Sequence, residues 1–402
     1  MTTALETSAP DRRDMLVTRI GIGVWLLFNL VILVLVWRNP GVSSVVGNYQ
    51  YGALGWWAGN DVYGSGIDGF IYLPSFALVY TPFALLGEPW GDILWRIVSV
   101  GLLTYAVWRA LRLYLPAHYV QAFGPALLLI LPAGSAALRN GQASTLLVAL
   151  MLLAALAIAE RRWWVAALLL ALAFATKPLA IVMLLLASAL YRPLALRLML
   201  CTVIVLLLPL VNSDPLAAWH LYGLGVDKVL ASSMPGPRGW SDITGLLGLF
   251  GLVLSPLALT ILRVASALAT LLLGLLARRR QDSAQAALSL FALSTSYLML
   301  MSPRTEENTY IMLAVSMALF AMLLLWPDGP IYRARTFGGW MIVALCIALG
   351  AHAYGNWIFR PTKLWLKPLI CIVFLATVIQ ACRGRLFQRS TLSIEPIASS
   401  PT

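Results

Sequence analysis

The chain has 402 residues, of which 60% are hydrophobic and 11% are charged, and its mean hydropathy is +0.85. It has too little polar surface to cover a water-soluble globule, so lipid must cover much of it. The formal net charge is +12, but the basic residues separate apolar runs instead of gathering in one stretch. This spacing excludes a nucleic-acid-binding face and indicates membrane topology.

The apolar runs are long and rich in Leu and Ala, without the alternation of barrel strands. Because every backbone amide in hydrocarbon needs an internal partner, we expect an all-α fold, a polytopic transmembrane helical bundle. The four cysteines lie within or at the ends of apolar runs without a CxxC pair, and the three histidines are scattered. We therefore expect no disulfide framework, no metal site and no cofactor.

The first apolar run, residues 17–37, follows several arginines and lacks a small-residue cleavage site, which predicts a retained helix with a cytoplasmic amino terminus. If the later Arg-rich gaps lie on the same side, both termini are cytoplasmic. About twelve helices then cross or enter the membrane. They are expected at 17–37, 93–112, 118–136, 143–159, 163–176, 178–191, 197–211, 257–277, 283–301, 310–326, 338–356 and 364–381.

These boundaries predict one integral membrane domain over residues 17–382, with cytoplasmic tails at 1–16 and 383–402. Two long segments, 38–92 and 212–256, are expected to be extracytoplasmic or interfacial loops. The first is crowded with tryptophan and tyrosine, which favour the membrane interface. An apolar stretch inside it is short and contains two prolines, so we expect it to lie at the interface and not to cross.

Two of the predicted helices, 163–176 and 178–191, are too short for ordinary spans. Each arm reaches roughly 21 Å, against a hydrocarbon core of about 30 Å. The dipeptide Lys177-Pro178 separates them, and proline removes an amide donor and disfavours a helical residue before it. The pattern predicts a helical hairpin that presents a lysine within the membrane.

Most acidic residues map to the outer side in this topology, while the helices contain few ionisable residues. Ionisable groups inside a membrane are costly and mark functional sites by default. A transporter or lipid flippase would carry such groups in several helices, with broken helices in matching halves, and neither pattern is found. The distribution favours an outward-facing site, with a transporter or a catalytically silent membrane scaffold as alternatives.

Three motifs in chain order resemble the "GQ…R…KP" core of glycosyltransferase family 87. They are Asn140-Gly141-Gln142, Glu160-Arg161-Arg162 and Ala175-Thr176-Lys177-Pro178. Two further stretches, Gly59-Asn60-Asp61-Val62-Tyr63 and Phe70-Ile71-Tyr72-Leu73-Pro74, are similar to the first outer loop of that family. Ser302-Pro303-Arg304, followed by Asn308 and Tyr310, resembles the loop before one of its late helices.

The resemblance implies the GT-C fold and a multi-pass enzyme of the bacterial cytoplasmic membrane. Such enzymes take a sugar, often mannose, from a polyprenyl-phosphate donor and add it to a lipid or glycan acceptor on the extracytoplasmic side. The transfer needs a base for the proton of the acceptor hydroxyl and cations for the phosphate that leaves. We therefore expect a base and phosphate-binding cations among the residues on the outer side.

Lys177 is the expected contact of the donor phosphate, because a cation on a short hairpin can meet a phosphate at membrane depth. A lysine that reaches the interface, or pairs with an acid to hold the hairpin, would leave the same pattern. Arg139 and Arg304 are the further candidates for the phosphate. Arg139 could equally anchor the end of a helix.

The family usually places an aspartate where this chain has Asn48, and an amide cannot act as a base. Asp61 and Asp68 are therefore the expected catalytic acids, although Asp61 also suits an ordinary turn. Glu306 and Glu307 could orient the acceptor, substitute as the base, or cap the helix that follows. The expected substrate-binding residues are Asn48, Tyr63, Tyr72, Asn140, Gln142, Glu306, Glu307, Asn308 and Tyr310.

Overall fold

The computed structural model describes residues 12–64, 69–211, 214–232, 240–326 and 332–384. All regular elements in these ranges are helices, and no strand occurs among them. The elements are α1 (Arg12–Arg38), α2 (Val46–Trp57), α3 (Pro74–Ala84), α4 (Trp90–Tyr114), α5 (Tyr119–Asn140), α6 (Ala143–Ala159), α7 (Trp163–Thr176), η1 (Pro178–Ala180), α8 (Ile181–Leu190), α9 (Arg192–Leu207), η2 (Leu208–Val211), α10 (Pro215–Ser232), α11 (Ile243–Gly248), α12 (Pro256–Arg280), α13 (Ser283–Met301), η3 (Glu307–Tyr310), α14 (Ile311–Leu325), α15 (Tyr332–Leu349), η4 (Ala351–Tyr354), α16 (Asn356–Thr362) and α17 (Leu366–Cys382).

The expected all-helical, multi-pass bundle is confirmed. Seven described helices are long and apolar enough to cross a membrane, and the bent pair α16 and α17 would make an eighth. All twelve predicted segments contain helix, but four of them correspond to shorter apolar helices of 10–17 residues. The number of full-length spans is thus smaller than the number of predicted helices, because length as well as hydropathy decides whether a helix can cross.

Burial separates the central helices from the peripheral ones. In α14 and α13 the most apolar windows are 83% and 78% buried, and α6 is buried on nearly every side. The corresponding windows of α1 and α12 are only 22% and 11% buried. Helices that are apolar all round but lie in the centre pack against protein, whereas equally apolar helices at the rim offer their side chains to lipid.

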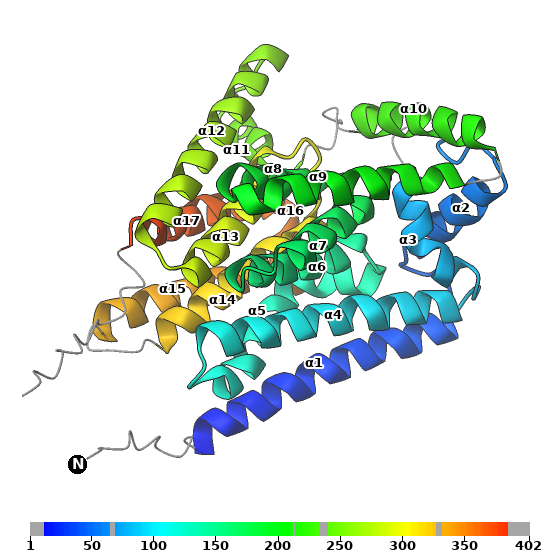
Figure 1. Cartoon of the computed structure of the whole chain (residues 1–402). Coiled ribbons are helices and arrows are strands. Elements are labelled where there is room, and N and C mark those ends of the chain that lie inside the picture. The colour runs from blue at the N-terminus through cyan, green and yellow to red at the C-terminus, as the bar shows by residue number, and fades with distance from the viewer. Residues whose placement is uncertain (1–11, 65–68, 212–213, 233–239, 327–331, 385–402) are drawn as a thin grey trace, which may run out of the picture.

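The first helix is held to the bundle by small residues. Helix α1 runs along one side of the molecule, next to α4 and in contact with α5 (Figure 1). A Cβ atom on Gly21 would lie 2.5 Å from the carbonyl oxygen of Gly124, and one on Gly124 would lie 2.3 Å from that of Thr18. Only glycine permits this backbone approach, as in other packed membrane helices.

The two long outer segments, expected as loops, contain helices. Helices α2 and α3 lie within 38–92, while α10 and α11 lie within 212–256, and α2, α3 and α10 gather at the same end of the molecule (Figure 1). Helix α3 has 11 residues and begins with Pro74, whose missing amide donor is harmless in a first turn. It is too short to cross, in agreement with the interfacial segment predicted here.

The predicted helix break at Lys177 is confirmed. Helix α7 ends at Thr176, and Lys177 follows in an extended conformation with φ −157° and ψ 127°. Pro178 then opens the short helix η1, which continues into α8. The extended lysine is the conformation that a following proline imposes, so this break is a local property of the sequence.

Candidate functional site

The break between α7 and η1 directs Lys177 towards two segments distant in sequence. Its Nζ donates to the Oγ of Ser144, in the first turn of α6, at 3.3 Å. The charges of Glu306 and Arg304 act on the same ammonium group. Lys177 is partly buried, so it is neither packed away nor fully in solvent. The helix break thus brings a cation to the loop that joins α13 to η3.

That loop supplies an ion pair beside Lys177. The Nε of Arg304 donates to Glu306 Oε1 at 2.8 Å, and the two side chains are 17% and 31% exposed. The guanidinium of Arg304 also lies 5.1 Å from the centre of the Trp240 ring, a cation–π distance. Because both charged groups remain accessible, a ligand can reach the carboxylate and the guanidinium.

Two tyrosines from the first outer segment border the same charges. The hydroxyls of Tyr49 and Tyr72 lie 3.0 Å apart, and Tyr49 Oη accepts from the backbone amide of Ala143 at 3.1 Å. Burial raises the pKa of Tyr49 to about 12, and the Glu306 charge contributes. Burial also raises the pKa of Tyr72, with Tyr49 and then Glu306 as further causes. Both phenols therefore keep their protons at neutral pH and form an uncharged border to the cluster.

The "charged cluster" of Lys177, Arg304 and Glu306 therefore lies where four segments meet. Helix α2 and the segment before α3 supply the tyrosines, the α7 break supplies the lysine, and the loop after α13 supplies the ion pair. The sequence analysis had paired Lys177 with Asp61 and Asp68. The structure adds Glu306, which had been considered as a substitute base.

Of the two acids predicted from the first outer loop, only Asp61 lies within the described residues. Asp61 is exposed, and its Oδ1 accepts from the backbone amide of Tyr63 at 2.8 Å, the geometry of a turn. Asp68 lies outside the described residues. Asn48 is exposed on α2, one residue before the buried Tyr49. The catalytic roles of Asp61 and Asp68 stay predictions.

The motif at the start of α6 acts mainly through its backbone. Gly141 has φ +65°, a left-handed conformation that suits glycine and turns the chain from α5 into α6. The carbonyl of Asn140 accepts a hydrogen bond from the backbone amide of Val45 at 3.0 Å. Gln142 is the N-cap residue of α6 and is 7% exposed. Arg139 is exposed, with a long contact of 3.4 Å to Ser43 Oγ.

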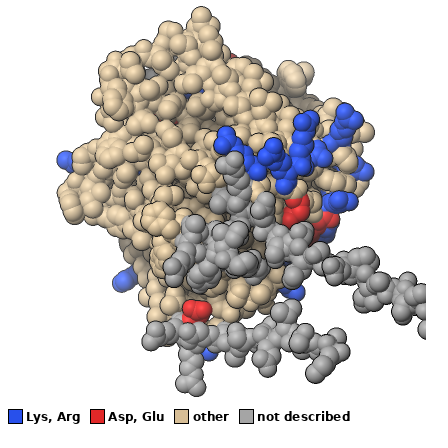
Figure 2. Space-filling view, turned by 90° about the vertical axis from the view of Figure 1, so that its left-hand side faces the viewer, with Lys and Arg blue, Asp and Glu red and all other residues tan. Residues whose placement is uncertain are grey.

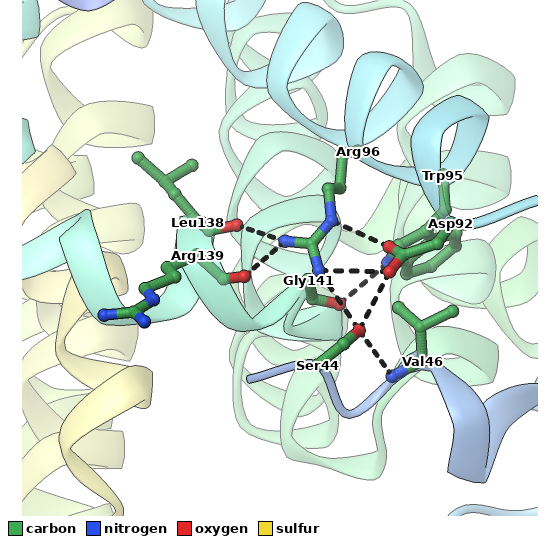
Figure 3. Close-up of polar contacts among 8 residues, drawn as sticks. All are labelled: Ser44, Val46, Asp92, Trp95, Arg96, Leu138, Arg139 and Gly141. Carbon is green, nitrogen blue, oxygen red and sulfur yellow. Dashed lines mark hydrogen bonds and ion pairs between the residues drawn. The ribbon is translucent and has the colours of Figure 1, made fainter. Parts of the chain in front are cut away.

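A buried ion pair that the sequence analysis did not single out supports this motif (Figure 3). Arg96 and Asp92 are each 3% exposed, and Arg96 Nε donates to Asp92 Oδ1 at 2.7 Å. Arg96 Nη1 donates to the carbonyls of Leu138 and Arg139 at 2.7 and 2.6 Å, and Nη2 donates to Ser44 Oγ at 3.1 Å. In the sequence, this pair could have been recognised from an acid and an arginine spaced four residues apart at the start of a helix.

The remaining residues predicted to bind substrate are not members of the charged cluster. Tyr63 is buried and its hydroxyl donates to the carbonyl of Tyr72 at 3.0 Å. Tyr310 is fully buried, and its hydroxyl donates to the carbonyl of Ser241 at 2.7 Å. Glu307 begins η3 with Oε2 4.0 Å from Lys367 Nζ, while Asn308, in the same turn, is partly buried.

An apolar groove opens beside the cluster. It has a volume of about 850 Å³ and is lined by residues of α7, α9 and α10 together with Leu73. Leu73 directly follows Tyr72, and Phe174, also in the lining, precedes Lys177 by less than one helical turn. The edge of the groove formed by Leu73 and Phe174 therefore lies close to the charged cluster.

Among the described residues, no group of three or more His, Cys, Asp or Glu side chains could hold a metal ion.

Comparison with known proteins gives the family. No curated protein matches the chain. The sequence model of glycosyltransferase family 87 matches residues 70–303, which is more than half of the chain. The match includes Tyr72, the motif before α6 and Lys177, and it ends just before Arg304. The chain therefore belongs to glycosyltransferase family 87.

Proposed function

We propose that this membrane glycosyltransferase moves a sugar from a polyprenyl-phosphate donor to a lipid or glycan acceptor, with the charged cluster as its reaction centre. The observation that carries the proposal is that Lys177, at the helix break, lies within electrostatic range of the accessible Arg304–Glu306 ion pair. The bundle then corresponds to the GT-C arrangement that the family resemblance implies.

In the proposed reaction the acceptor hydroxyl oxygen bonds to the anomeric carbon as the bond from that carbon to the phosphate oxygen breaks. The proton of the acceptor goes to the Glu306 carboxylate, and the polyprenyl phosphate leaves with the electron pair. Lys177 and Arg304 stabilise the charge that develops on this phosphate. Arg139 stays a candidate for a further phosphate contact.

Glu306 is the proposed base because it is the acid whose field reaches Lys177, Tyr49 and Tyr72. Its side chain is 31% exposed, so an acceptor can approach it. Asp61 carries its own hydrogen bond within a turn, which favours a structural role in the loop. Asp68 remains a second candidate from the same loop.

A lipid-linked donor is supported by the apolar groove between α7, α9 and α10. Its volume of about 850 Å³ suits part of an isoprenoid chain, and its lining is mainly hydrophobic, with His220 and Asp227 as polar members. A chain in the groove would place the attached phosphate near Lys177. Mannose is the proposed sugar, on the strength of the family resemblance alone.

The orientation of the site follows from charge. The face of the molecule where α1 begins carries a band of Lys and Arg side chains with few acids (Figure 2). Helix α12 ends with Arg278, Arg279 and Arg280, and α4 has Arg112 in its last turn. By the positive-inside rule we assign this face to the cytoplasm, which supports the proposal that the charged cluster opens to the extracytoplasmic side of a bacterial inner membrane.

The test measures sugar transfer from radiolabelled polyprenyl-phosphate mannose in membranes that contain the chain. We expect Glu306→Gln to lower the rate by about a hundredfold or more, since general base catalysis contributes about 10²–10⁴-fold. Asp61→Asn is the matched control and should change the rate less than threefold. Wild-type transfer with an unchanged rate in Glu306→Gln and a large loss in Asp61→Asn or Asp68→Asn would move the base to the first outer loop.

A further inference from the structure

Two neighbouring carboxylates in the loop after α13 face different partners. Glu306 Oε1 accepts from Arg304 at 2.8 Å, on the side of Lys177. Glu307 Oε2 instead lies 4.0 Å from Lys367 Nζ, which belongs to α17. The chain thus separates two adjacent negative charges by giving each its own cation.

Lys367 is built into the protein. Its side chain is 2% exposed, and its ammonium lies 5.2 Å from the centre of the Tyr310 ring. Lys367 Nζ is 3.3 Å from Nδ1 of His352, and an ammonium can only donate, so this ring nitrogen accepts. The imidazole proton is then on Nε2, which faces Ser135 Oγ at 3.3 Å. His352 is therefore neutral, and Glu307 is the group that offsets the buried lysine charge.

The same residues hold the loop in place. Tyr310 donates to the carbonyl of Ser241, and the amide of Ser241 donates to the carbonyl of Thr305 at 3.2 Å. Thr305 lies between Arg304 and Glu306 in the chain, so the contacts of Tyr310 and Lys367 limit how far the ion pair can move. An uncompensated Glu307 would be a second, partly buried anion next to Glu306, competing for Arg304.

We propose that Lys367 is a positioning residue for the transferase centre: by neutralising Glu307 it keeps Arg304 paired with Glu306. This inference rests on the proposed function, in which Glu306 is the base. Lys367 itself is too deeply buried to touch donor or acceptor. Its effect reaches the reaction through the charge and the conformation of the loop.

The proposal predicts how the base titrates. Within the described part of the chain, the charged or titratable groups that interact with Glu306 are Arg304, Lys177, Tyr49 and Tyr72. Behind it, on the other side of the loop, lie the groups that interact with Glu307 or Lys367, namely Glu307, Lys363, Lys367 and His352. Removing the positive charge of Lys367 favours the protonated form of Glu306, whereas removing the negative charge of Glu307 favours its ionised form.

The experiment follows the rate of transfer from radiolabelled polyprenyl-phosphate mannose as the pH is lowered through the acid limb of the pH–rate profile, which reports protonation of the base. We expect Lys367→Met to move this limb up by about half a pH unit or more, and Glu307→Gln to move it down by a similar amount. Lys367→Arg keeps the charge and should keep the wild-type limb. The double variant Lys367→Met with Glu307→Gln removes one positive and one negative charge, so the net charge of the pair stays zero. It should therefore keep the wild-type acid limb.

A purely structural ion pair gives a different result, because both single variants break the same contact. If both lowered the rate with an unchanged limb, or moved the limb in the same direction, the proposal would be overturned. Glu306→Gln separates this outcome from failure of the proposed function. Full transfer by Glu306→Gln would reject the base assignment, whereas an inactive Glu306→Gln together with unshifted single variants would reject only the role of Lys367.

Discussion

Two cations deep in the helical bundle, Arg96 and Lys177, have contrasting surroundings. Arg96 is 3% exposed and donates to an aspartate, a serine and two backbone carbonyls. In the described part of the chain, the ammonium of Lys177 makes one long hydrogen bond of 3.3 Å, to Ser144, and is partly exposed. One guanidinium is saturated with partners, while the ammonium keeps donors available for a ligand.

The contrast teaches that charge inside a membrane bundle is not by itself a sign of catalysis. Arg96 ties the start of α4 to the end of α5 and to Ser44, so its hydrogen bonds stabilise the framework of the site. Lys177 stands at a helix break and meets charges from another loop. Hydrogen-bond saturation is therefore the property that supports a structural role for Arg96 and the proposed functional role for Lys177.

The largest effect that would sharpen this comparison is on stability. Arg96→Met leaves the carboxylate of Asp92 buried without its cation, which should cost about 3–5 kcal/mol of the free energy of unfolding. Thermal unfolding of the purified protein in detergent measures it. Asp92→Asn combined with Arg96→Met should recover part of the loss. An Arg96→Met protein as stable as the wild type would mean that the buried pair does not support the framework.

The next effect concerns rate. Lys177→Ala should lower transfer from polyprenyl-phosphate mannose at least tenfold, about 1.4 kcal/mol of transition-state stabilisation, while the unfolding temperature stays near the wild-type value. The matched control is Arg197→Ala, which removes a cation stacked on Trp164 near the start of α9. If Lys177→Ala instead lowered the stability of the protein while the folded fraction kept the wild-type rate, Lys177 would have a structural role like that of Arg96.

The smallest effect is a pH dependence of stability. Burial, and then the Lys367 charge, lower the pKa of His352 from 6.5 to about 3. Because the folded state binds the proton less well than the unfolded state, stability is complete above about pH 6.5 and falls as the pH drops. The loss should be about 1 kcal/mol at about pH 5.5.

Unfolding temperatures measured at two pH values, near 7.5 and 5.5, check the His352 prediction. His352→Gln should flatten the dependence between these values, because glutamine does not titrate. An equally steep dependence in the variant would assign the proton uptake to another group.

Local features were predictable from the sequence. Each of the twelve predicted segments contains helix, and the break at Lys177 follows from the next residue being proline. The shortness of α3, an 11-residue helix with prolines at Pro74 and Pro82, also followed, whereas its place at the interface stays a prediction. These properties depend on residues that are neighbours in the chain, so no knowledge of the tertiary packing was needed.

Non-local features were not predictable. The expected meeting of Lys177 with acids of the first outer loop stays a prediction. The structure brings Lys177 within range of the Glu306 charge, more than a hundred residues later. The helices α2 and α10 were expected as loops, because their aromatic and mixed composition resembles interfacial chain more than a span. The spacing of Asp92 and Arg96 in the sequence only weakly indicated an ion pair. The backbone carbonyls of Leu138 and Arg139, which accept from Arg96, are too distant in sequence for a local pattern to predict.

By itself, the sequence determined the class of the protein, the positions of its apolar helices and the helix break, because hydropathy and proline act over a few residues. The tertiary structure decided which charges meet and which are saturated. Helix packing brings together side chains from distant segments, and a buried charge is tolerated only where such partners surround it.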